Sequence, residues 1–266
     1  MNRIKNGDIV GRKSYNKDII FIVVDGKDTN NVILKGIFER IIADSNIEDL
    51  EPISEETLEN TRALREKRIE KIESRLDNKY ISGKILHLDG DKKYSEKSLK
   101  YYKKMGIRAV VKNIPESKQP KMVYNLLRMY KPDILVVTGH DSMIKKERGY
   151  YDIYNYRNSR YFLATVLEAR RYEKDTNSDL VIFAGACQSY FEALIQAGAN
   201  FASSPARILI DILDPLIVAK EVATTDNFRY VRIEDIEHKL RDGLRGVGGI
   251  GARGKKIDSK VEGILW

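Results

Sequence analysis

The segment DILVVTGH at residues 133–140 and the segment DLVIFAGAC at residues 179–187 decide the fold. Each contains a nearly uninterrupted apolar run, then a turn of small residues, and then one reactive side chain. Such runs, rich in β-branched residues, predict strands buried on both faces, which is typical of a parallel sheet. Because the carboxyl ends of parallel strands meet at one edge of the sheet, we expect His140 and Cys187 at that edge.

Strand and helix patterns alternate around these two segments. The alternation predicts an α/β domain with an open, mostly parallel sheet and helices on both faces. The predicted strands are 84–88, 107–111, 133–137, 179–184 and 200–202, and the predicted helices are 95–105, 120–130, 159–172, 188–197 and 205–219.

The start of the chain has a different pattern. Short β-branched runs separated by turns predict a small, SH3-like β-barrel module over residues 1–53. Residues 54–80 then read as a connecting helix with acidic residues in its first turn. The α/β domain would occupy residues 81–242, and the Gly-rich, basic residues 243–266 would form a tail.

Composition narrows the class of protein. The 266 residues contain no apolar run near the ~20 residues that a membrane span needs. The N-terminus lacks the apolar region of a secretory signal, so we expect a soluble protein used in the cytoplasm. The net charge of +8 comes from 47 basic and 39 acidic residues, which favours a solvated surface over a nucleic-acid groove.

The single cysteine, Cys187, excludes an internal disulfide and cysteine-rich zinc sites. We expect no metal and no cofactor. A lone cysteine is often a small buried hydrophobe, and a histidine after a strand is often a loop residue. Their occurrence at equivalent strand ends instead favours a catalytic pair.

The chemistry of such a pair follows from its surroundings. Cys187 precedes a predicted helix, whose positive end would favour the thiolate. His140 would take the thiol proton and later give a proton to a leaving amine. The backbone N–H groups of Cys187 and Asp141 would form an oxyanion hole.

These residues resemble a known family. The blocks 134–140 and 180–189 are similar to the two catalytic blocks of caspase-like peptidases, in which His also precedes Cys by about 50 residues. Segments 5–12, 138–142, 185–189 and 203–207 further resemble sporulation-specific proteases of endospore-forming bacteria. The resemblance implies a cysteine endopeptidase of the mother-cell cytoplasm or spore coat. It also implies spore coat and germination proteins as substrates, and cleavage on the carboxyl side of Arg, as in clostripain-like enzymes.

One residue departs from the family pattern. Caspase-like enzymes have Gly after the catalytic histidine, whereas this chain has Asp141. The N–H of Asp141 still serves an oxyanion hole if its side chain points away. Alternatively the carboxylate orients His140 or binds a basic substrate, and the sequence leaves these possibilities open.

Selection of arginine requires a buried carboxylate, because a guanidinium is recognised by bidentate pairing. Asp89 and Asp91 follow the first strand of the domain and are candidates, unless they only form a turn. Ser203 is a further candidate for substrate binding. Arg245 and Arg253 lie in the Gly-rich stretch and are candidate self-cleavage sites.

Two other functions remain open from the residues alone. One is a cysteine-dependent, amidotransferase-like hydrolase, although such enzymes usually have the histidine after the cysteine. The other is a non-catalytic basic module that binds nucleic acid or an anionic spore-surface polymer. That module would leave Cys187 unreactive and bind with steep salt dependence.

Overall fold

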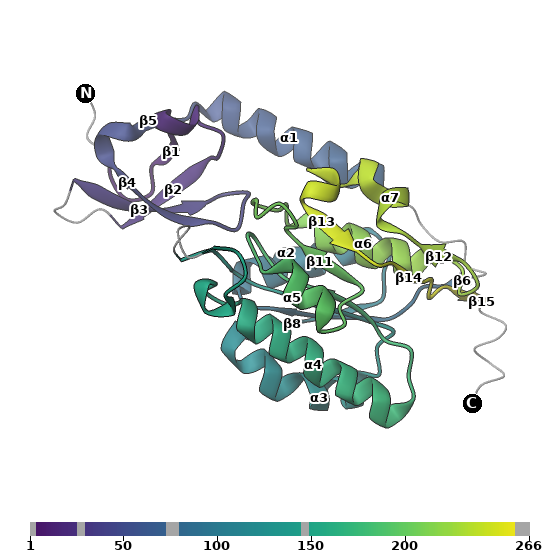
Figure 1. The fold of residues 1–266 in the computed structure, drawn as a ribbon. Helices are drawn as coiled ribbons and strands as arrows, with labels where there is room; N and C mark the ends of the chain where they lie inside the picture. The colour runs from purple at the N-terminus through teal and green to yellow at the C-terminus, as the bar shows by residue number, and fades with distance from the viewer. Residues whose placement is uncertain (1–3, 26–29, 73–79, 145–148, 259–266) are drawn as a thin grey trace. The chain divides into compact units, whose positions relative to one another are not determined.

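The computed structural model describes residues 4–25, 30–72, 80–144 and 149–258 (Figure 1). The chain divides into two compact units, residues 1–71 and residues 72–266. The first contains β1 (Ile9–Arg12), β2 (Phe21–Asp25), β3 (Asn31–Gly36), β4 (Ile42–Asn46), β5 (Leu50–Pro52) and most of α1 (Glu55–Ile72). The second contains β6 (Tyr80–Ile81), β7 (Ile85–Asp89), α2 (Lys92–Lys104), β8 (Ala109–Asn113), α3 (Gln119–Tyr130), β9 (Ile134–Thr138), α4 (Ser159–Thr176), β10 (Val181–Ala184), α5 (Phe191–Gln196), β11 (Phe201–Ser203), α6 (Leu213–Thr224), β12 (Tyr230–Val231), α7 (Ile233–Ile236), β13 (Val247–Gly249), β14 (Ala252–Arg253) and β15 (Ile257–Asp258).

The first unit is an antiparallel sheet with the strand order β4-β3-β2-β1-β5. Leu58 of α1 packs on this sheet with Ile20 and Phe38, and all three side chains are buried. Within the described residues the edge strands β4 and β5 do not pair, so the expected closed barrel is an open sheet instead. β5 is short and ends at Pro52, which has no N–H to donate to a further strand.

The predicted connecting helix is helical over Glu55–Ile72. Ile69 of this helix is 2% exposed. Residues 73–79 of the predicted helix lie outside the described residues.

The second unit confirms the predicted parallel sheet. Its six strands follow the order β13-β11-β10-β9-β7-β8. The five strands from β8 to β11 are mutually parallel, and β13 runs antiparallel to β11. β13 lies in the stretch that we expected to form a basic tail, so this stretch contributes to the sheet.

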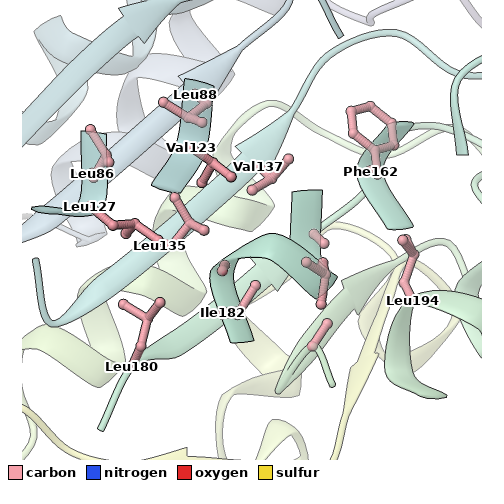
Figure 2. Close-up of a cluster of buried hydrophobic side chains, with 14 of the residues drawn as sticks. Leu86, Leu88, Val123, Leu127, Leu135, Val137, Phe162, Leu180, Ile182 and Leu194 are labelled. Carbon is pink, nitrogen blue, oxygen red and sulfur yellow. The ribbon is translucent and has the colours of Figure 1, made fainter. Parts of the chain in front are cut away.

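Helices cover both faces of this sheet. One face packs on α3, α4 and α5 through a continuous apolar cluster (Figure 2). The sheet supplies residues two apart along each strand, such as Leu86 and Leu88, as the alternation of side chains in a strand requires. The opposite face contacts α2 and α6, which also contact each other.

Two helices begin later than the sequence predicts. α5 begins at Phe191 instead of residue 188, and α6 begins at Leu213 instead of residue 205. Gln188, Ser204 and Arg207 have φ angles of 55°, 66° and 55°, in the left-handed region that a right-handed helix cannot contain. Residues 204–212 therefore form an irregular segment after β11, and this segment borders the candidate site.

Candidate active site

The strand register brings three predicted site residues to one edge of the sheet. β10 pairs with β9 so that Val181 lies beside Ile134, a separation of 47 positions, and Cys187 follows His140 by the same 47 positions. β9 pairs with β7 so that Thr138 lies beside Asp89, 49 positions earlier, and Asp91 precedes His140 by 49. The three parallel strands thus end in turns that carry Asp91, His140 and Cys187 at matching positions.

His140 is held from two sides. Its Nε2 lies 3.0 Å from Oδ2 of Asp91, and its backbone N–H donates to Oε1 of Glu116 at 2.7 Å. The ring of Tyr94 meets the imidazole edge-on, with 6.0 Å between ring centroids. The imidazole is 22% exposed, so it is oriented but still open to solvent. A proton on Nε2 donated to Asp91 leaves Nδ1 as the basic nitrogen.

Asp91 has two tasks in this arrangement. One carboxylate oxygen bonds His140, and the other accepts the Tyr94 N–H at 3.2 Å and caps the start of α2. A carboxylate fixed by a helix cap is a rigid support for an imidazole. The sequence assigned Asp91 to an arginine pocket, whereas its present contact is with the histidine.

Glu116 explains why glycines occur at this edge. A Cβ atom at Gly139 or at Gly90 would overlap the Glu116 carboxyl group. The two glycines therefore admit the carboxylate that accepts the His140 N–H. Sequence reasoning did not find Glu116, since it lies in a short 3-10 helix after β8 and not in the turns that follow β9 and β10.

Cys187 is 1% exposed. The Ile210 N–H donates to its Sγ at 3.4 Å, and the sulfur lies 4.0 Å from the Ile210 carbonyl oxygen. The next residue, Gln188, donates its N–H to Ser204 Oγ and to the Ile208 carbonyl oxygen, both at 3.1 Å. The segment after β11 thus covers the thiol, and a peptide reaches the sulfur only when this segment moves.

The expected thiolate-stabilising helix is absent from this position. α5 begins four residues after Cys187, because Gln188 has a left-handed conformation. The Ile210 N–H, rather than a helix end, is the donor that the structure places at the sulfur.

The Asp141 side chain points away from the histidine and into the protein. Oδ1 accepts the backbone N–H groups of Ser142 and Asn158 at 2.9 and 2.8 Å, and Oδ2 accepts the hydroxyl groups of Ser159 and Ser189. No described residue accepts a hydrogen bond from the Asp141 backbone N–H. The arrangement meets the condition for an oxyanion hole at this residue, namely that the carboxylate be turned away.

Burial raises the pKa of Asp141 from 3.8 to about 6, although the four hydrogen bonds partly oppose this shift. Between these two pH values the folded protein binds more protons than the unfolded chain, so its stability falls as pH rises. We expect wild type to lose about 2 kcal/mol of unfolding free energy between pH 4 and 7 through this group. Asp141→Asn should lack that loss. Urea unfolding of both proteins at several pH values measures the difference, and parallel pH curves would contradict the shift.

The remaining predicted residues are buried. Asp89 is fully buried and accepts hydrogen bonds from Thr138 Oγ1 at 3.0 Å and from the Asp91 N–H at 2.9 Å. Thr138 Oγ1 also lies 2.7 Å from Nε2 of the buried His87. This network supports the turn that carries Asp91. Ser203 is also fully buried, and its hydroxyl makes no hydrogen bond with any described residue.

The segment after β11 contains charged residues that sequence reasoning missed. Arg207 donates to Tyr156 Oη at 2.8 Å and pairs with Glu192, and its guanidinium lies beside the stacked rings of Tyr156 and Tyr190. Asp211 and Asp214 are buried near Arg241. The signal was present in IDILD at residues 210–214, where two acids interrupt an apolar run.

A parallel α/β sheet with an oriented imidazole and a thiol at the ends of adjacent strands defines a candidate thiol hydrolase. Among the described residues, no group of three or more His, Cys, Asp or Glu side chains is gathered as metal ligands. No helix in the described part of the chain has the length and apolar character to cross a membrane.

Comparison with known proteins identifies the particular family. A family model described as YabG peptidase U57 matches residues 5–80 and 65–259. The chain is 38% identical over 276 residues to the "Sporulation-specific protease YabG" of Bacillus subtilis (strain 168), covering 93% of this chain and 94% of that protein. The chain therefore belongs to the YabG peptidase U57 family and is a protease. No solved structure matches it.

Proposed function

We propose that this protease is a cysteine endopeptidase that uses Cys187 as nucleophile and His140 as general base. The main support is the register of β9 and β10, which continues into turns that carry both residues at the same edge. The hydrogen bond that His140 Nε2 donates to the Asp91 carboxylate adds the third element that orients a catalytic base.

The reaction would proceed through an acyl-enzyme. His140 takes the thiol proton on Nδ1 while the sulfur attacks the scissile carbonyl carbon, and the carbonyl oxygen becomes an oxyanion. The backbone N–H groups of Cys187 and Asp141 stabilise that oxyanion. The C–N bond then breaks and the leaving amine receives the proton from His140. Water, deprotonated by the same histidine, hydrolyses the thioester and restores the thiol.

The sheet also supports the caspase-like assignment. Counted in chain order within the sheet, the strands lie as 2-1-3-4-5-6, with the sixth antiparallel. His140 follows the third of these strands and Cys187 follows the fourth, so the histidine precedes the cysteine in the same order as in caspase-like peptidases. The order His before Cys disfavours the amidotransferase-like alternative, and membership of a peptidase family disfavours a binding module.

We further propose that the enzyme cleaves on the carboxyl side of arginine, in proteins of the spore coat and of germination. The name of the Bacillus subtilis relative supports a role in sporulation. The enzyme would act in the mother-cell cytoplasm or at the spore coat. Self-cleavage would occur at Arg245, at the end of a 3-10 helix, or at exposed Arg253 in β14. Sequencing the new termini of incubated protein tests this, and an intact chain in the active enzyme contradicts it.

Thiol labelling tests the nucleophile. We expect stoichiometric alkylation of Cys187 by iodoacetamide to abolish cleavage, because the reagent consumes the attacking sulfur. Activity should fall in proportion to the labelled fraction, measured by mass spectrometry of the intact chain. Mapping of the products of denatured coat proteins should show arginine before each cleaved bond. Full activity after complete labelling would overturn the proposal.

A further inference from the structure

One peptide group connects Arg241 to the thiol. The carbonyl oxygen of Leu209 accepts a hydrogen bond from Nη2 of Arg241, and the N–H of the same peptide, on Ile210, donates to Cys187 Sγ at 3.4 Å. This peptide lies over a sulfur that is 1% exposed. The guanidinium thus anchors the group that covers the nucleophile.

Arg241 is fixed by acidic groups. Its backbone N–H donates to Asp214 Oδ1 at 3.1 Å, and its Nε donates to Asp242 Oδ2 at 2.6 Å. Burial by itself would lower the pKa of this guanidinium, but the attraction of Asp242, Asp211 and Asp214 raises it. The side chain is 29% exposed, so it can be replaced from solvent.

Asp211 and Asp214 are two buried carboxylates near Arg241 that are suited to bind an arginine side chain. They are 1% and 0% exposed, and Asp214 Oδ2 accepts the Asp211 N–H at 3.3 Å. The Leu213 N–H donates to Asp211 Oδ1 at 2.9 Å, so both carboxylates are held by backbone N–H groups of one turn. Two buried carboxylates in one turn favour a nearby cation, and a guanidinium is the cation that carboxylates bind best. The structure already places an arginine of the chain in their field.

A buried hydroxyl without a hydrogen bond to any described residue lies near Asp214. Ser203 Oγ is buried and makes no hydrogen bond with any described residue. Gly246 connects this hydroxyl to Asp214. Its carbonyl oxygen accepts the N–H of the adjoining Ser204 at 2.7 Å, and a Cβ atom built on Gly246 would lie 3.9 Å from Asp214 Oδ2. Ala202 packs on the face of the sheet that bears α3 and α4, so Ser203 faces the side of α6, where Asp214 lies. Such a hydroxyl is left for an incoming polar group.

We propose that Arg241 is a latch on the nucleophile and that the arginine side chain of a substrate opens it. The substrate guanidinium takes over the carboxylates of Asp211 and Asp214, with Ser203 as an additional hydrogen-bond partner. Arg241 then releases the Leu209–Ile210 peptide and the thiol is uncovered. This inference rests on the proposed roles of Cys187 and of arginine in the substrate.

The exchange conserves charge, since one guanidinium replaces another in the electrostatic field of Asp211 and Asp214. An ammonium group has no planar fork and would replace Arg241 less effectively. A neutral group would leave both carboxylates without a cation. An arginine in the substrate would therefore bind the two carboxylates and at the same time uncover the thiol. Recognition of the substrate would thus be coupled to activation of the enzyme.

The rate at which iodoacetamide alkylates Cys187 measures whether the latch is closed. Arg241→Gln should alkylate about tenfold faster than wild type or more, as expected from the loss of a charge-assisted hydrogen bond. Arg229→Gln is the matched control, because Arg229 is exposed and its side chain makes no hydrogen bond or ion pair with a described residue. It should react at the wild-type rate.

A small probe tests the arginine subsite without any change at Arg241. Ethylguanidinium, which carries the arginine head group but cannot be cleaved, should accelerate alkylation of wild type toward the rate of Arg241→Gln. The neutral isostere N-ethylurea should have no effect, and n-butylamine should have a smaller one. The acceleration should disappear in Asp211→Asn and in Asp214→Asn.

Four results would overturn the inference. Equal alkylation rates in Arg241→Gln and wild type would show that Arg241 is not a latch. Acceleration by N-ethylurea equal to that by ethylguanidinium, no acceleration by either, or acceleration that persists in both aspartate variants, would show that these carboxylates do not bind the probe. Alkylation does not require catalysis. A failure of the proposed function, such as cleavage by Cys187→Ala, is therefore distinguished from a failure of the latch.

Discussion

Cys187→Ala should lower kcat/KM for an arginine-containing peptide by a factor of at least about 10⁴, because no other group replaces the attacking sulfur. The residual rate should not respond to iodoacetamide. The measurement is a progress curve on a fluorogenic peptide with wild type and variant at equal concentration.

The variant should remain folded, so that the loss reports on chemistry. Alanine fits the space of the thiol, and the main structural cost is an unpaired Ile210 N–H, on the order of 1–3 kcal/mol. Circular dichroism and the thermal midpoint check this. A folded Cys187→Ala protein that cleaves at the wild-type rate would exclude the cysteine mechanism.

His140→Ala should lower kcat/KM by a factor of about 10²–10⁴, the range typical for removal of a general base. Without the imidazole the thiol keeps its proton at neutral pH. The alkylation rate of Cys187 should therefore rise with pH along a curve that is shifted to higher pH relative to wild type. Peptide cleavage and the pH profile of alkylation measure the two effects separately.

The matched control is His238→Ala. His238 is exposed, lies in the 3-10 helix Glu237–Lys239, and should leave both measurements unchanged. Asp91→Asn should lose part of the activity, since the amide no longer stabilises an imidazolium. If His140→Ala retained wild-type kcat/KM, the histidine would have no part in proton transfer.

Because the Cys187 thiol is buried, cleavage and alkylation rates also depend on how often the sulfur becomes accessible. The segment 204–212 carries Ile210 over the sulfur and, through Arg207, is tied to Glu192 and Tyr156. In the proposed mechanism this segment would have to move before attack, so variants in it should change the rate at which the thiol becomes accessible. The proposed catalytic pair and the segment that covers the thiol can thus be tested separately.

The apolar segments 133–138 and 179–184 were sufficient to predict the sheet. A strand that is apolar on both faces has few alternatives to the centre of a parallel sheet, and the β9–β10 pairing confirms that interpretation. The predicted starts of α5 and α6 were wrong, because Gln188, Ser204 and Arg207 have left-handed backbone conformations in sequences that otherwise favour a helix. Helix propensity does not report such positions when they are not glycine.

The candidate site was likewise predicted in part from the sequence. The sequence was sufficient to place His140 and Cys187 after adjacent strands, while their catalytic roles stay a prediction. It could not assign the carboxylates. Asp89, Asp91, Asp141 and Asp211 all stand near strand or segment ends, and the partner of each depends on which way its turn points.

By itself, the sequence determined the parallel α/β sheet and the edge at which a histidine and a cysteine meet, because both follow from local hydrophobic patterns. Only the tertiary structure decided that Asp91 holds the imidazole, that the Asp141 carboxylate is turned inward, and that the Leu209–Ile210 peptide covers the thiol. Each of these depends on contacts between residues far apart in the chain. Such contacts are set by strand register and turn geometry, and no local pattern encodes them.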